Sequence, residues 1–198
     1  MARPRLVSDV EILDAARSCF IEQGPQVSTT VIAEQVGLSQ AALFKRFGTK
    51  QQLMLAALRP PEVPSWIARV EQGPDDRPID EQLREIAESI SAFFVEMAPR
   101  LATLWASGCQ VREIMAEFEV PPPVRGMLAL TRWFTIARDA GLVHSENPQV
   151  TALMMIGSLH GRAFMGTMLG ADAGPGLDQY ASQLANTMWR GIAPREGE

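Results

Sequence analysis

Cysteine is scarce in this chain, with two among 198 residues, and histidine (two) and tyrosine (one) are equally rare. Cys19 and Cys109 provide no disulfide framework, so we expect a reducing compartment, the cytoplasm. The cysteines and histidines lack metal-ligand spacing, and no glycine-rich phosphate loop, nucleophile motif or paired-carboxylate signature is present. We therefore expect no metal, no cofactor and no enzymatic activity. Cys109 has no adjacent basic or resolving partner that would favour redox sensing.

A long uninterrupted apolar run is also missing. The most apolar stretch, Val150 to Gly170, is interrupted by Ser158, His160, Arg162 and Thr167. It is a poor membrane span and a better buried helix, so we expect no membrane association. The composition, 46% hydrophobic and 21% charged, is that of an ordinary globular protein with enough chain to bury a core.

An excess of positive charge is absent as well, because 18 basic and 23 acidic residues give a net charge of −5. Net charge alone does not predict nucleic-acid binding. The charge is uneven, however: residues 1–58 hold six cations and five acids, whereas residues 59–198 hold twelve and eighteen. Three of the six N-terminal cations are Lys45, Arg46 and Lys50. Because local potential decides what a small patch binds, this cluster keeps nucleic acid open as a partner.

Nearly every segment has helical periodicity. Residues 8–58 predict four short helices joined by turns, and Ser8 with Glu11 forms the capping box of the first. A proline-rich connector follows at 60–79, around a short helix at 65–72, and longer helices follow it. Pro99 should kink or split one of these. We predict an all-α fold of about nine to ten helices, with a helix-turn-helix domain at residues 1–58 and a larger helical domain at 59–198.

The stretch from Thr29 to Lys50 has the mechanics of a helix-turn-helix. Gly37 supplies the turn, Leu38 follows as an apolar plug, and Ser39 begins a short exposed helix. On that helix Leu43 and Phe47 are predicted to face inward. The outward residues include Gln40, which can read a base edge, and cations that can reach phosphates or guanine.

Residues 12–58 resemble the DNA-binding domain of TetR-type (TetR/AcrR) transcriptional regulators. The resemblance rests on Ile12-Leu13-x-Ala15-Ala16-x-x-Cys19-Phe20, Gly24, Thr29-Thr30, Ile32-Ala33, Val36-Gly37-Leu38-Ser39, Leu43-Phe44-x-Arg46-Phe47 and Thr49-Lys50-x-x-Leu53. It implies that Thr29, Thr30 and Lys50 hold phosphates. The full set of expected DNA-contacting residues is Thr29, Thr30, Ser39, Gln40, Ala41, Phe44, Lys45, Arg46 and Lys50.

One departure from the family pattern lies in the recognition helix. The family usually has tyrosine where this chain has Phe44, which cannot donate a hydroxyl hydrogen bond to the backbone. We expect either weaker phosphate binding or an apolar contact with a thymine methyl group. Arg3 and Arg5 precede the first helix, where a minor-groove arm and a solvated chain start are equally open interpretations.

Large apolar residues recur on the helices of the second domain. Most belong to the core on the simplest interpretation, yet flexible and aromatic side chains beside a kinked helix also suit a roomy apolar cavity. The family resemblance implies an inducer pocket between these helices. Its candidate lining residues are Phe94, Met97, Trp105, Phe118, Trp133 and Phe134.

The stretch from Asn147 to Ala171 carries a single charge, Arg162, which indicates a helix covered on more than one side. Small residues along it allow another helix to come close, and with the last helix it predicts a four-helix dimer interface. A central core helix of a monomer is the alternative. The candidate interface residues are Val150, Met154, Gly157, Gly161, Phe164, Leu184 and Met188.

Together these features predict a ligand-responsive transcriptional regulator that binds palindromic double-stranded DNA as a homodimer. A small, hydrophobic effector would release it, which makes it a repressor by default, although the sequence leaves activation open. The alternative is a helical ligand-binding or adaptor protein of the same fold that has lost DNA binding, which Phe44 and the low net charge of the first domain motivate.

Overall fold

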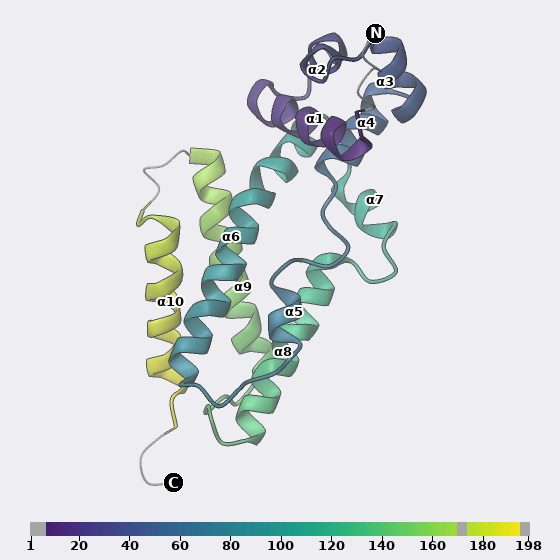
Figure 1. Cartoon of the computed structure of the whole chain (residues 1–198). Coiled ribbons are helices and arrows are strands. Elements are labelled where there is room, and N and C mark those ends of the chain that lie inside the picture. Colours follow the sequence, from purple (N-terminus) through teal and green to yellow (C-terminus); the bar gives the residue numbers. More distant parts are fainter. Residues whose placement is uncertain (1–6, 170–173, 195–198) are drawn as a thin grey trace. The chain divides into compact units, whose positions relative to one another are not determined.

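The computed structural model describes residues 7–169 and 174–194. Within these residues the secondary structure consists of ten helices and no strand, which confirms the all-α prediction. The helices, in chain order (Figure 1), are α1 (Asp9–Gln23), α2 (Thr29–Gln35), α3 (Gln40–Phe47), α4 (Lys50–Leu58), α5 (Ile67–Val70), α6 (Ile79–Ala106), α7 (Val111–Ala116), α8 (Pro122–Asp139), α9 (Pro148–Leu169) and α10 (Leu177–Ile192). None of these helices has both the length and the apolarity that a bilayer crossing requires.

The chain forms two compact units. The first contains Met1–Arg59 and Pro99–Ile114, and the second contains Pro60–Ala98 and Met115–Glu198. The first unit thus holds α1 to α4 together with the end of α6 and the start of α7. The division at residue 58 that the sequence suggests stays a prediction.

In the first unit α1 packs against α2 and α4, and α3 packs against both α2 and α4. Apolar residues at helical spacing on α1, such as Ile12, Ala16 and Phe20, are fully buried. Leu43 of α3 and Leu53 of α4 are fully buried as well. Removing these side chains from water is the main force that holds the four short helices together, because helices of seven to nine residues are marginal on their own.

The turn between α2 and α3 depends on glycine. Gly37 has φ +70°, a left-handed conformation that residues with a Cβ rarely adopt. The amide of Gly37 donates to the carbonyl of Glu34 (3.0 Å), and the amide of Leu38 donates to the carbonyl of Ala33 (2.8 Å). These are the two hydrogen bonds of a Schellman motif, so the last carbonyls of α2 are satisfied as the chain turns.

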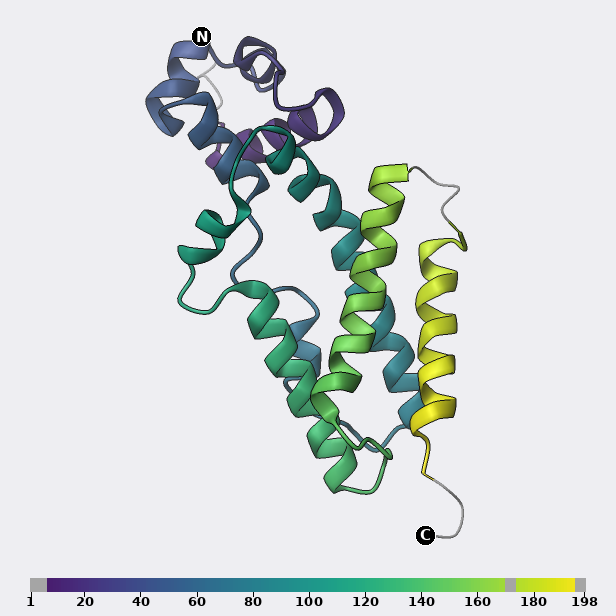
Figure 2. The same ribbon diagram turned by 180° about the vertical axis from the view of Figure 1, so that it is seen from behind.

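In the second unit α9 lies between α8 and α10 (Figures 1 and 2). The core includes large side chains from α8, and the rings of Trp133 and Phe134 meet edge to face with centroids 5.2 Å apart. The proline-rich connector carries only the short α5, shorter than the 65–72 helix that the sequence suggests. Asn147 accepts hydrogen bonds from the amides of Gln149 and Val150, and so caps α9 as its Asn-Pro sequence indicates.

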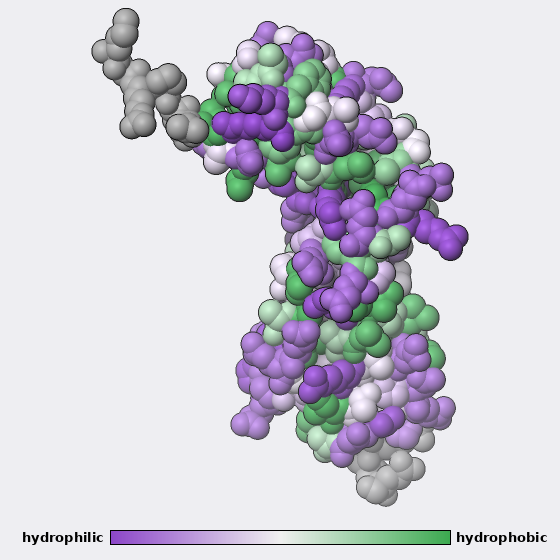
Figure 3. All heavy atoms as spheres, turned by 90° about the vertical axis from the view of Figure 1, so that its right-hand side faces the viewer, coloured by the Kyte–Doolittle hydropathy of each residue, from purple (hydrophilic) through white to green (hydrophobic). Residues whose placement is uncertain are grey.

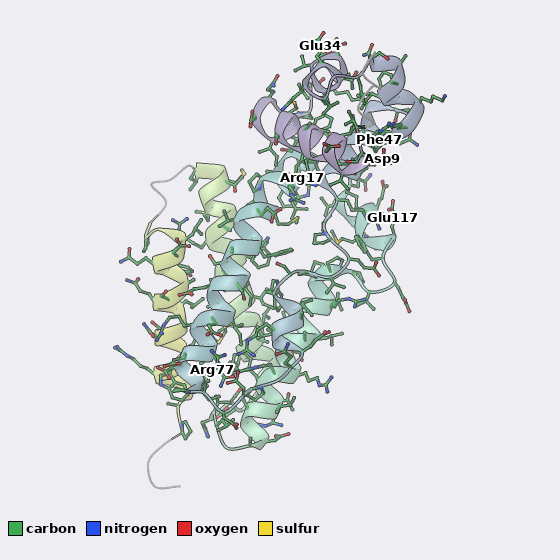
Figure 4. All side chains as sticks on the ribbon, in the orientation of Figure 1. Asp9, Arg17, Glu34, Phe47, Arg77 and Glu117 are labelled. Atoms are coloured by element: carbon green, nitrogen blue, oxygen red, sulfur yellow. The ribbon has the colours of Figure 1, made fainter. Side chains whose placement is uncertain are left out.

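Hydrogen bonds and ion pairs hold the segment around Asp75 and Arg77 against the start of α6. The buried Gln82 side chain accepts from the amide of Asp75 (2.9 Å) and donates to the carbonyls of Asp75 and Arg77. Arg77, labelled in Figure 4, pairs with both Asp75 and Glu85. Hydrogen bonds from Arg77 and then from Arg69 hold the pKa of Asp75 well below its usual range.

Pro99 does not end α6, so the predicted split is not observed. The helix continues for seven residues beyond it, to Ala106. Proline removes one donor from the helical ladder, and the cost is local. Thr103 donates its hydroxyl to the carbonyl of Pro99 (2.9 Å), and Ala98 and Arg100 on either side are buried, so packing maintains the helix through this position.

Candidate nucleic-acid interface

The outer face of α3 is open to solvent. Ser39 begins the helix by accepting a hydrogen bond from the amide of Ala42 (3.2 Å), and Gly48 ends it with φ +74°. Leu43 is the buried residue of α3, whereas Gln40, Ala41 and Lys45 are exposed. Phe44 and Phe47 are half-buried. The helix therefore has one anchored side and one available side, as recognition of a DNA groove requires.

Gln40 connects the two helices of the motif. Its Nε2 donates to the Oγ1 of Thr29 over 2.7 Å, so the N-terminal ends of α2 and α3 are joined directly. Thr29 is only 5% exposed, whereas Thr30 beside it is exposed. The structure thus brings together two residues of the expected DNA-contacting set. Their roles in holding phosphate or reading a base remain predictions.

Arg46, at the C-terminal end of α3, turns back to the start of α1. Its Nη1 donates to the carbonyl of Val7 (2.6 Å) and to a carboxylate oxygen of Asp9 (3.3 Å), and Asp9 is labelled near Phe47 in Figure 4. A guanidinium has five N–H donors, so donors remain for a phosphate or guanine while these contacts persist. The ion pair with Asp9 is exposed and contributes at most about 1 kcal/mol, so a nucleic-acid ligand can compete for it.

Lys50 lies at the other end of this surface, at the first position of α4. Thr49 caps α4 in a capping box with Gln52, in which each side chain accepts from the other residue's backbone amide. The first turn of the helix has its partial positive charge here, and Lys50 adds a full one. Anions bind such helix starts, which agrees with the phosphate role expected of Lys50.

Two contacts that the sequence analysis did not predict hold α1 in place. Arg17 donates through Nε to the carbonyl of Ala57 (3.0 Å), near the end of α4. Cys19 contacts the amide oxygen of Gln35 on α2 (2.8 Å), and burial raises the pKa of its thiol. Helical spacing places Cys19 on the buried side of α1, but the partners depend on how the helices pack. Arg3 and Arg5 lie outside the described residues.

The six candidate lining residues of an effector pocket have different surroundings. Trp133, Phe134 and Met97 are buried in the second unit, and Phe94 packs against its core with its ring 5.0 Å from that of His160. Phe118 is half-buried, whereas Trp105 belongs to the first unit and is 46% exposed. Their role as a pocket stays a prediction.

The candidate dimer residues lie mainly on one exposed side of α9. Val150 and Met154 are half or more exposed, and Gly157 is exposed. Gly161, Phe164 and Leu184 are partly buried, while Met188 of α10 is 7% exposed and packs in the core of its own unit. Further exposed apolar residues on α9 are Leu153, Met165, Met168 and Leu169.

The described residues contain no group of three or more histidine, cysteine, aspartate or glutamate side chains arranged to hold a metal ion.

This arrangement has the geometry of a helix-turn-helix domain, and comparison with known proteins agrees. Residues 12–57 match the family model described as bacterial regulatory proteins, tetR family. The resemblance predicted from the sequence is therefore confirmed over this domain. No curated protein matches the sequence directly.

Solved structures of TetR-family regulators share the fold along nearly the whole chain. A TetR-family regulator of Mesorhizobium loti is 17% identical, covers 93% of this chain and 96% of its own, and has a TM-score of 0.71. FadR from Bacillus subtilis, in complex with stearoyl-CoA, is 17% identical (93% and 100% covered; TM-score 0.68). NalD, the secondary repressor of the MexAB-OprM multidrug efflux pump in Pseudomonas aeruginosa, is 18% identical (92% and 93%; TM-score 0.61).

Proposed function

We propose that this protein is a ligand-responsive transcriptional regulator that binds double-stranded DNA. The observation that carries the proposal is the open face of α3, which Ser39 caps and Gln40 connects to α2. A short, rigid, exposed helix with cations at its end and on the neighbouring helix start suits the major groove and its flanking phosphates.

The exposed surface of α9 supports binding as a homodimer. Val150, Met154 and the other exposed apolar residues of α9 form an apolar surface whose contact with water is unfavourable. The α9 helix of a second copy would cover this surface. Two recognition helices about 34–36 Å apart would then enter successive major grooves on one face of a palindromic operator.

The second unit would hold a small, hydrophobic effector in the cytoplasm. Its core contains large aromatic and flexible residues, such as Trp133, Phe134 and Met97, that suit an apolar ligand. FadR was solved with stearoyl-CoA and NalD is described as a repressor, which supports ligand response and repression for this chain.

The effector would favour a spacing of the two recognition helices that DNA cannot match, and so would release the DNA. The fourth helix and the connector after it would transmit this change, because they join the two domains in the chain.

Selection of bound duplexes from a random DNA pool, followed by a salt titration, tests the proposal. Arg46, Lys45 and Lys50 of two subunits would neutralise up to six phosphates, so the slope of log affinity against log salt would approach about −5. An adaptor protein that has lost DNA binding would enrich no sequence and show no such slope. That result would reject the regulatory function while leaving the effector site open.

A further inference from the structure

A hollow of about 320 Å³ lies on the surface of the second unit along α8. Figure 3 shows the side of the molecule on which α8 lies, where apolar and hydrophilic side chains are interspersed. The size is at the lower end of the range for small-molecule sites. Its lining residues are Glu71, Val120, Arg125, Leu128, Ala129 and Arg132.

The α8 residues of the hollow lie on one face of the helix. Arg125, Leu128, Ala129 and Arg132 follow the i, i+3, i+4, i+7 spacing, so the two guanidinium groups stand about two turns apart with apolar side chains between them. Leu128 is 61% exposed, which is a large apolar surface to leave in water. The hollow thus combines two cations with an apolar floor.

Neither arginine has an ion-pair partner within residues 7–169 and 174–194, and the Nε of Arg125 is buried without a hydrogen-bond acceptor. Three other arginines of this unit, Arg69, Arg77 and Arg138, each pair with a carboxylate. A buried donor without an acceptor is costly, and one on a charged group is more so. An anionic ligand in the hollow would supply acceptors for the two guanidinium groups.

Glu71 limits the charge of that anion. With two arginines and one glutamate the hollow has a net charge of +1, so a monoanion neutralises it, whereas a dianion such as a phosphate monoester leaves an excess negative charge beside Glu71. A carboxylate also matches the planar guanidinium geometry. The exposed Leu128 and the neighbouring Val120 would then contact an apolar body attached to the carboxylate.

We propose that this hollow is a binding site for a small amphipathic monocarboxylate. Arg125 and Arg132 bind the carboxylate, and Leu128, Ala129 and Val120 contact the apolar part. The site is separate from the α3 surface and from the buried aromatic residues predicted to hold the effector. It requires no DNA, so its test is independent of the proposed regulatory function.

Titration of the full chain with sodium octanoate tests the site, using arginine labelled with ¹⁵N to observe the Nε–H signals. Arg125→Gln and Arg132→Gln assign the two signals and serve as binding variants. Arg138→Gln is the matched control, because Arg138 is on the same helix, pairs with Asp139 and does not line this hollow. 1-Octanol and inorganic phosphate test the contributions of the charge and of the apolar body.

Octanoate should shift the Nε–H signals of Arg125 and Arg132 saturably. Each glutamine variant should bind at least tenfold more weakly, with Arg138→Gln within twofold of the parent, and both octanol and phosphate should bind at least tenfold more weakly than octanoate. Arg132 is exposed, so Arg132→Gln keeps the test decisive even if Arg125→Gln fails to fold. Unchanged octanoate affinity in Arg132→Gln, or octanol binding as tightly as octanoate, would overturn the proposal.

Discussion

Gly126 of α8 is the position where one added methyl group has the clearest predicted effect. A Cβ built on it would lie 2.7 Å from Cζ2 and 2.9 Å from Cη2 of Trp66, which is itself 4% exposed. An ordinary contact needs about 1 Å more, so the indole ring must shift within a packed core. Overpacking of this kind costs about 1–3 kcal/mol. Alanine recovers about 0.5–1 kcal/mol of helix propensity, so the mid-range difference is a destabilisation of about 1 kcal/mol for Gly126→Ala.

Urea unfolding followed by circular dichroism at pH 7 measures this free energy. Gly191→Ala in α10 is the control, because nothing lies within 4 Å of its added Cβ, and it should be neutral or slightly stabilising. In a Trp66→Leu background the clash is removed, so Gly126→Ala should no longer destabilise. A Gly126→Ala protein as stable as the parent would show that α5 and α8 do not pack this closely.

Three further predictions concern DNA, assembly and acid stability. Lys50→Ala should weaken binding of all DNA sequences alike and reduce the salt slope by about one for each subunit; an altered sequence preference would contradict its phosphate role. Gly161→Leu should disrupt the dimer, and an unchanged mass by light scattering would place the interface elsewhere. The lowered pKa of Asp75 stabilises the fold while the unfolded carboxyl is ionised, above about pH 4, and this contribution disappears as pH falls. Urea unfolding of Asp75→Asn should therefore show a shallower loss of stability between about pH 5 and pH 3; a slope like the parent's would refute the argument.

Local signals in the sequence predicted much of the first domain. The caps at Ser8, Ser39 and Thr49 and the turn at Gly37 need only neighbouring residues, so the pattern of residue types reveals them. The burial of Leu43 follows from helical spacing in the same way.

Contacts between helices were not predictable in this manner. Gln40 donates a hydrogen bond to Thr29, 11 positions earlier in the chain, and Arg46 donates one to the carbonyl of Val7, 39 positions earlier. Both contacts depend on the packing of α1, α2 and α3. Met188 shows the same limit, because its helical spacing is compatible with a dimer interface while the structure buries it in its own unit. Pro99 was expected to kink or split its helix, and the split does not occur because packing maintains the helix.

The proposed function requires that the exposed face of α3 binds the DNA major groove. Selection from a random duplex pool with the parent protein and with a Gln40→Ala, Lys45→Ala double variant tests it most directly. We expect one enriched palindromic sequence for the parent and loss of that enrichment in the variant, with the helical content unchanged. No enrichment by the parent, or the same enriched sequence in both proteins, would contradict it.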